Sequence, residues 1–540
     1  MNTLKKKSLH AAVLAGLAAV GAAGTAEAVH INPDGLGQVL LFPYYTSRSG
    51  QFTAISIINT QNNTKAVKVR FLEGKNSREV LDFNLFMSPS DVWTGAIVQT
   101  AEGARIISND NSCVTPSDLF AETRTDNLGL PLNAFKNYNY TVGAVDNPSF
   151  ASLDRTREGY FEVIEMAVID DNLVTGDVMA AGTAATLTGF IKHNTAGVPA
   201  NCPALDSFDA FLGNPAAIQF PGPVFPLAGA FLTPPRGGLA GRESILNSAT
   251  GANYTISPTA IDAWSITVQY TEAGNTSPTL SLANPSVSNI FTSAGVVSAT
   301  WATGRDAMSA SLMRNTVLNE FILDAGTQSQ TDWIVTFPTK RSYVPVGPGA
   351  ALAASAPFAN NFHNTVNDGS CDPYAFSVFN REEQVPGTIS TLPQPSPLPP
   401  AGTAFGAQLC WEANIIPFAT ASLLGSTNTN PLIAGLQSFV SGTAPSGPAF
   451  SVAVAPATPS LRGTQGPNGW FLLNFNSATQ GLTPVSATIT PLGGVPVALA
   501  PGRHNGMPVI GTMVHNYRNI GVISLYGGVV DHKYTRNIGP

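Results

Sequence analysis

Three histidines near the C-terminus are the first residues in this chain that could do chemistry. His504, His515 and His532 could together offer imidazole ligands to zinc or copper. Their spacings of 11 and 17 residues match no local ligand motif. We therefore expect the three side chains to lie on loops and strand ends, exposed to solvent, and the metal site stays the alternative.

A secreted hydrolase would carry a catalytic motif or a pair of facing carboxylates. The chain contains neither a G-x-S-x-G nucleophile motif nor an H-E-x-x-H zinc motif. Glu382 and Glu383 are adjacent, and Glu162 and Glu165 are three apart, so on a strand each pair would point to opposite faces. Paired catalytic carboxylates must instead face each other across a substrate. We expect exposed surface charges here and do not predict an enzyme.

Calcium fits an extracellular β protein better than zinc or copper does. Two segments, 109–112 and 170–177, supply Asp110, Asp170, Asp171 and Asp177, and carboxylate oxygens are the ligands that calcium prefers. Neither segment follows the D-x-D-x-D-G calcium loop, and Asp and Asn also populate turns for their own backbone hydrogen bonds. These four residues are weak calcium candidates, and no other cofactor is predicted.

The chain contains four cysteines, Cys113, Cys202, Cys371 and Cys410. An even number of cysteines in an exported chain indicates disulfides, and three pairings are possible. We favour Cys113 with Cys202 and Cys371 with Cys410, because each pair closes a long, loop-rich excursion.

Aromatic residues could form a platform on which sugars stack. The candidates are Tyr44, Tyr45, Trp93, Trp301, Trp333, Trp411 and Trp470. Most of the tryptophans lie within apolar runs that resemble strands, so we expect core packing rather than a glycan site.

The first 28 residues are typical of a secretory signal peptide. Three lysines precede an apolar run of small residues, and Ala26-Glu27-Ala28 matches an A-x-A cleavage site. Removing residues 1–28 changes the net charge from −7 to −9. A mildly acidic chain without a basic cluster disfavours nucleic acid as a partner, and no apolar run is long enough to predict a membrane span.

Composition predicts a mainly β fold. Only 11% of the 540 residues are charged, while 50 glycines and 41 prolines separate short apolar runs. Leu36 to Phe42 is apolar on both faces and is closed by Pro43. Val67, Val69 and Phe71 alternate with Lys68 and Arg70, a pattern typical of a half-exposed antiparallel strand.

Further strands are predicted at 159–169, 186–191, 265–270 and 331–344, with one short helix over 306–314 capped by Asp306. Together these elements predict a large antiparallel β-sandwich, Ig-like or jelly-roll-like, with long loop insertions and few short helices. We predict one domain over residues 29–540. A split near the proline-rich segment 387–402 is the alternative.

Three blocks carry a resemblance to known sequences: LGQVLLFPYYT (Leu36 to Thr46), TDWIVTFPTKR (Thr331 to Arg341) and LYGGVVDHKYTR (Leu525 to Arg536). They resemble segments of uncharacterised exported β-rich proteobacterial proteins. The resemblance implies export and a β-rich fold, and it brings no activity and no functional residues.

These features favour a secreted structural or adhesive protein of the bacterial cell surface or extracellular matrix, with the periplasm also open. The strand at 36–42 could complete its own sheet or be donated to the sheet edge of another copy. A carbohydrate- or ligand-binding exported protein is the first alternative, with cell-surface glycans as partners. A secreted hydrolase with dispersed carboxylates is the second.

Overall fold

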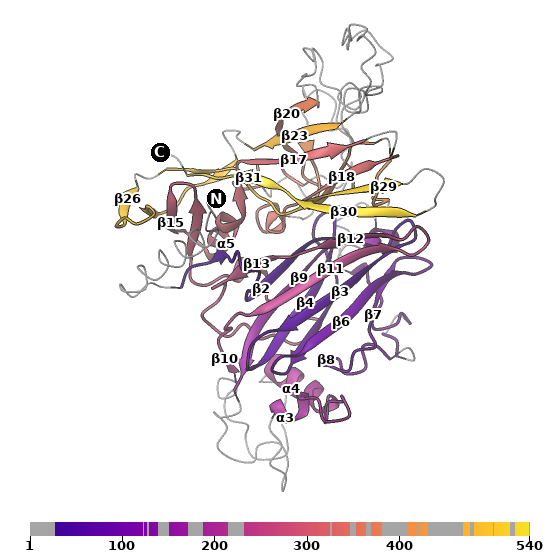
Figure 1. Ribbon diagram of the computed structural model, residues 1–540. Coiled ribbons are helices and arrows are strands. Elements are labelled where there is room, and N and C mark those ends of the chain that lie inside the picture. Colours follow the sequence, from indigo (N-terminus) through magenta and orange to yellow (C-terminus); the bar gives the residue numbers. More distant parts are fainter. Residues whose placement is uncertain are drawn as a thin grey trace, which may run out of the picture.

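The computed structural model describes residues 27–121, 124–126, 129–138, 151–170, 187–213, 232–323, 327–345, 353–362, 369–380, 408–419, 421–429, 468–475, 480–499, 502–518 and 524–538. These residues form a mainly β structure in which every strand ladder between named strands is antiparallel, as the sequence predicted. Figure 1 shows a sandwich built from the first half of the chain below several sheets built from the second half.

Two sheets form the N-terminal sandwich. The larger sheet has eight strands, in the order β1 (His30–Ile31), β13 (Thr259–Asp262), β2 (Val39–Thr46), β9 (Glu158–Ile169), β4 (Thr64–Glu73), β5 (Glu79–Met87) and β8 (Cys113–Thr115), with β10 (Leu232–Thr233) also paired to β9. The smaller sheet has five, in the order β12 (Ala252–Ile256), β11 (Leu239–Asn247), β3 (Gln51–Asn59), β6 (Val92–Gln99) and β7 (Ala104–Ile107).

The core of this sandwich comes from side chains that alternate along the strands. Val67, Val69 and Phe71 of β4 point inward, as predicted, and pack with Ile57 of β3 and Trp93 of β6 from the opposite sheet. Side chains of successive strand residues point to opposite faces, so this alternation buries one apolar row per strand.

The prediction that the other face of β4 is exposed was wrong. Lys68 and Arg70 are buried, because segments from residues 264–284 and the second half of the chain cover this face of the sheet. Both residues form ion pairs with carboxylates of neighbouring strands, as buried charges must.

The second half of the chain forms three four-stranded sheets and three smaller ones. The first four-stranded sheet has the order β14 (Val287–Thr292), β15 (Gly295–Thr300), β25 (Ser486–Thr490) and β26 (Val497–Leu499), and the second has the order β20 (Ala375–Asn380), β23 (Asn468–Asn474), β17 (Thr316–Ile322) and β31 (Lys533–Thr535). The third has the order β22 (Ala413–Pro417), β18 (Gln330–Thr336), β29 (Thr512–Arg518) and β30 (Leu525–Asp531). Among the smaller sheets, β16 (Met313–Arg314) pairs with β28 (Met507–Pro508), β19 (Asp372–Pro373) pairs with β21 (Gln408–Leu409), and β27 (His504–Asn505) lies between β24 (Gly481–Leu482) and β32 (Asn537–Ile538).

A continuous interface joins the sandwich to the C-terminal sheets. Tyr44 and Tyr254 from the sandwich share a buried cluster with Ile334, Ile415 and Val514 from the second half. Across the same interface the Thr336 hydroxyl donates to the carbonyl oxygen of Pro43. The interface is therefore both apolar and hydrogen-bonded, like the inside of a domain.

Three short α-helices occur among the residues that the structure describes: α3 (Leu187–Ile191), α4 (Pro203–Gly213) and α5 (Gly304–Leu312). The 3₁₀ helices are η2 (Leu153–Arg157), η5 (Leu280–Leu282) and η6 (Lys340–Ser342). The predicted strand at 186–191 is thus wrong over 187–191, where Leu187 and Ile191 lie four residues apart and are buried on one helical face. The predicted helix at 306–314 begins instead at Gly304, and its cap is Thr303, whose side chain accepts from the Asp306 amide.

Two predicted strands end or lie elsewhere. The strand at the N-terminus does not stop before Pro43 but runs to Thr46, because a bulge between Phe42 and Tyr45 accommodates the proline. It lies between β13 and β9, and so completes its own sheet. Residues 265–270 form no ladder but lie over the large sheet, where the Gln269 amide donates to the Met166 carbonyl oxygen.

Two disulfides join Cys113 to Cys202 and Cys371 to Cys410, which confirms the favoured pairing. They indicate an oxidising, exported environment. Among the described residues, no helix is long and apolar enough to cross a membrane. The signal segment up to residue 26 and the proposed domain boundary at 387–402 lie outside the described residues.

Candidate functional site

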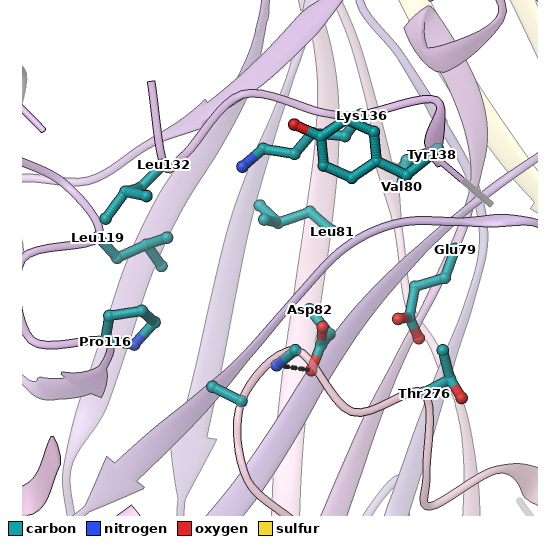
Figure 2. Close-up of a pocket in the computed structure, with 12 residues that line it drawn as sticks. Glu79, Val80, Leu81, Asp82, Pro116, Leu119, Leu132, Lys136, Tyr138 and Thr276 are labelled. Atoms are coloured by element: carbon teal, nitrogen blue, oxygen red, sulfur yellow. Dashed lines mark hydrogen bonds between the residues drawn. The ribbon is translucent and has the colours of Figure 1, made fainter. Parts of the chain in front are cut away.

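A cleft of about 320 Å³ opens beside the first half of β5 (Figure 2). Strand β8 pairs only with Asn84, Leu85 and Phe86, and no other described strand pairs with β5 on this side, although the Lys136 amide donates to the Val80 carbonyl oxygen. The cleft is lined by Glu79, Val80, Leu81, Asp82, Pro116, Leu119, Leu132, Lys136, Tyr138, Ala273, Gly274 and Thr276.

The floor of the cleft carries two carboxylates, Glu79 and Asp82. Residues three apart on a regular strand point to opposite faces, but β5 has a register shift next to Glu79. The bulge brings both side chains to the face of Arg70, the residue directly opposite Asp82 on β4. Glu79 Oε2 accepts from Arg70 Nε at 2.8 Å, and Asp82 Oδ2 accepts from Lys68 Nζ at 2.9 Å.

A third carboxylate, Glu162 of β9, lies behind this pair. Its Oε2 accepts from Arg70 Nη1 at 2.8 Å, so Arg70 bridges two acids. Burial raises the pKa of Glu162 to about 7, against the opposing charge of Arg70. Burial also raises the pKa of Glu79, and the negative charge of Asp82 adds to this effect. Glu79 and Glu162 therefore hold protons more tightly than isolated acids would.

The wall of the cleft is built around Asp126. Its Oδ2 accepts from Lys136 Nζ at 2.9 Å and from the hydroxyl of Tyr138, which makes a very short contact. Burial, and then the hydrogen bond to Asp126, raise the pKa of Tyr138 to about 12. Lys136 Nζ lies 5.7 Å from the centroid of the Tyr138 ring, so Asp126 and the Tyr138 ring both stabilise the positive charge of Lys136.

The opposite wall is the segment 272–276, which is hydrogen-bonded onto the sheet. The Gly274 amide donates to Asp82 Oδ2 at 2.9 Å, and Lys68 Nζ donates to the Glu272 carbonyl oxygen at 2.6 Å. Lys68 therefore ties this loop to the sheet while it also neutralises Asp82. Figure 2 shows Leu81, Leu119 and Leu132 on the remaining side, so the cleft is half apolar.

The chemistry that this cleft can perform depends on the contacts of its charged side chains. Glu79, Asp82 and Lys136 are each engaged in an ion pair with the surrounding framework. The described residues that line it include no serine, cysteine or histidine. The cleft offers a small molecule or a chain segment both charged and apolar contacts.

Two of the four predicted calcium ligands, Asp110 and Asp170, lie among the described residues. Asp110 accepts from the amide and hydroxyl of Ser112 through Oδ1 and from Thr94 through Oδ2, the turn-forming role that was the alternative. Asp170 is half-buried at the end of β9, and Asp171 and Asp177 lie outside the described residues. Within the described part of the chain no three His, Cys, Asp or Glu side chains could share a metal ion. Calcium binding stays a prediction.

The three C-terminal histidines are buried, not solvated as expected. His504 contacts the Ala310 carbonyl oxygen, and His532 contacts that of Ile334 and packs on Trp333. Burial lowers the pKa of His504 to about 4 and that of His532 to about 3, so both are neutral parts of the core. His515 is buried on β29.

The prediction of exposed carboxylates was wrong for Glu162 and Glu165. Both are buried and, as predicted, serve opposite faces, Glu162 toward Arg70 and Glu165 toward Lys65 at 2.6 Å. Glu382 and Glu383 lie outside the described residues. The aromatic residues are in the core as predicted, including Tyr44 and Tyr45, except for Trp470, which is 40% exposed and stacked on Phe379.

Sequence reasoning missed the residues of the cleft. The bulge that aligns Glu79 with Asp82 leaves no mark in the sequence EVLDF, and Lys136, Tyr138 and Asp126 come from a polar excursion with no periodic pattern. Comparison of the chain with protein-family models, with curated proteins and with solved structures found no significant match.

Proposed function

We propose that this chain is a secreted structural or adhesive protein of the bacterial cell surface or extracellular matrix, and that copies of it self-associate. The observation that carries the proposal is that the buried charged side chains form ion pairs and hydrogen bonds that hold neighbouring strands and segments of the molecule together.

The clearest of these contacts lies between the two halves of the chain. Glu158 of β9 is 1% exposed and accepts from Tyr44, from Arg48 at 2.8 Å, and from the hydroxyl groups of Ser426 and Thr427. It thereby connects the sandwich to a segment more than 260 residues later in the chain. Charge-assisted hydrogen bonds of this kind are among the strongest available to a protein.

The N-terminal strand bears on how copies would associate. Strand β2 is held by ladders on both sides, so donating it to another copy would require it to leave both. We therefore place self-association on surfaces that are free in the folded molecule. A ligand-binding role is the second candidate, and the half-apolar cleft at β5 is the observation that favours it.

Negative-stain electron microscopy of the protein from Val29 onward tests the proposal, over a range of concentrations and with and without calcium. The expected result is concentration-dependent oligomers, filaments or sheets. Discrete monomers under every condition would remove self-association and turn attention to ligands of the cleft.

A further inference from the structure

Residues 485–499 form a hairpin whose apolar side chains face solvent. Strands β25 and β26 are its two arms, and β26 lies at the far end of its sheet in Figure 1. Val485 is 66% exposed, Leu492 66%, Val495 75% and Val497 53%; the first three are the most exposed large apolar residues in the described structure. An apolar surface gathered on one protruding element is typical of a contact site.

The backbone of β26 is also free on one side. The sheet order is β14, β15, β25, β26, so β26 is hydrogen-bonded to β25 and no described strand follows it. Natural proteins commonly protect such an edge with charged side chains. This hairpin carries none, and indeed residues 476–501 contain no Asp, Glu, Lys, Arg or His.

Charge indicates which partner fits. The chain has a net charge of −7, so two copies repel each other where the acidic parts of their surfaces meet. The 485–499 hairpin is a surface on which two copies meet without this repulsion. A two-fold contact is self-complementary, and antiparallel pairing of identical edge strands satisfies that symmetry.

We propose that β26 of one molecule pairs antiparallel with β26 of a second copy of this chain. The two four-stranded sheets would join into one of eight strands centred near Ala498, with Val495 and Val497 covered by the partner. The inference rests on the proposed self-association and assigns it to one surface.

A lipid surface would be the other occupant of an apolar hairpin. Segments that lie in membrane interfaces usually carry Trp or Tyr together with Lys or Arg. The hairpin has none of these residues, and an acidic chain is repelled by anionic lipid. A second copy therefore fits it better.

The test uses the protein from Val29 onward and sedimentation velocity over a range of concentrations. The variant carries Val495→Asp and Val497→Asp, and the matched control carries Val198→Asp, an exposed valine remote in sequence. Burying unpaired carboxylates at the contact should raise the dissociation constant at least about tenfold, with the control unchanged. Circular dichroism checks that each variant is folded.

A crosslink gives a second, independent readout. All four native cysteines are in disulfides, so Ala498→Cys introduces a single free thiol. Pairing near Ala498 predicts a disulfide-linked dimer under mild oxidation, while Ala101→Cys, at an exposed turn, should stay monomeric.

The outcomes separate this inference from the proposed function. Self-association that persists unchanged in the Asp variant, without the Ala498→Cys crosslink, would overturn the hairpin contact and leave self-association standing. A wild-type protein that is monomeric throughout would overturn both. Binding of the wild type, but not the Asp variant, to phosphatidylcholine vesicles without dimer formation would replace the second copy with a membrane.

Discussion

Glu243 is a buried acid for which the described residues provide no hydrogen-bond partner. It lies in the middle of β11 between Ile55 and Ile256, it is fully buried, and neither carboxyl oxygen has a hydrogen-bond partner among the described residues. Burial alone raises its pKa well above the usual value, so the folded protein holds Glu243 protonated.

Replacing Glu243 with Leu should therefore stabilise the protein. The raised pKa means that the folded state binds this proton more tightly than the unfolded chain. The wild type consequently loses stability as pH rises above about 4.5 toward the folded pKa, at up to about 1.4 kcal/mol per pH unit. We expect Glu243→Leu to raise the free energy of unfolding at pH 8 by about 1–3 kcal/mol, with a smaller gain at pH 5.

Urea denaturation at the two pH values measures this difference. Glu102→Leu, at an exposed turn, is the control and should change little at either pH. A Glu243→Leu variant that is less stable at pH 8 would show that the carboxylate has an unseen partner.

Unlike Glu243, Arg70 is a buried charged residue with partners, because it forms ion pairs with Glu79 and Glu162. Changing Arg70 to Met removes the guanidinium that forms ion pairs with Glu79 and Glu162. We expect the free energy of unfolding to fall by about 3–5 kcal/mol at pH 8. The loss should be smaller at pH 5, where both acids can hold a proton.

Adding Glu79→Gln and Glu162→Gln to Arg70→Met should recover part of that stability, because the uncompensated charges are then gone. Denaturation curves of the single and the triple variant provide the comparison. Equal stability of the two would contradict the charge argument.

At the scale of elements, alternation predicted the strands but not what covers them. The sequence correctly assigned Val67, Val69 and Phe71 to one face of β4 and Lys68 and Arg70 to the other. The alternation also predicted that the charged face is exposed to solvent. That prediction was wrong, because alternation along one strand cannot show that a later segment of the chain packs over the sheet. The same limit hid the cleft, whose acids meet only through a bulge in β5.

Helix α3 shows the other limit of local patterns. The sequence TLTGFI is rich in β-branched and aromatic residues, and it predicts a strand. Its packing against α4 and the Cys113–Cys202 region instead favours a helical turn that buries Leu187 and Ile191. Tertiary contacts decide short apolar runs of this kind.

The disulfide pairing was predicted because each pair closes a long loop. The lengths of these loops also rank the expected loss of stability when each disulfide is removed. Cys113–Cys202 closes 89 residues and Cys371–Cys410 closes 39. Replacing either pair with Ser should lower the free energy of unfolding by about 2–5 kcal/mol, with the longer loop costing slightly more. Denaturation curves of both double variants test this, and no loss for the 113–202 pair would mean that α3 and α4 hold without it.

At the scale of the whole molecule, Glu158 joins the two halves. Burial would raise its pKa, but Arg48 and the donors from Ser426 and Thr427 outweigh that effect and hold the pKa below its usual value. Its contribution to stability is therefore present above about pH 4.5 and is lost as pH falls through the folded pKa.

We expect Glu158→Gln to lower the free energy of unfolding by about 3–5 kcal/mol at pH 7, because Arg48 then loses its buried anion and keeps only the more exposed Asp154. Calorimetry should also show whether the halves separate into two transitions. Glu320→Gln, on an exposed position of β17, is the matched control. An unchanged transition in Glu158→Gln would contradict a braced interface.

We expect this β structure, held together by buried ion pairs, to associate with copies of itself through uncharged surfaces. Sedimentation velocity of the protein from Val29 onward, over a wide concentration range and at low and high sodium chloride, is the decisive experiment. The average sedimentation coefficient should rise with concentration, and high salt should not abolish the rise, since apolar contacts are not screened. A single monomer boundary at every concentration would contradict it.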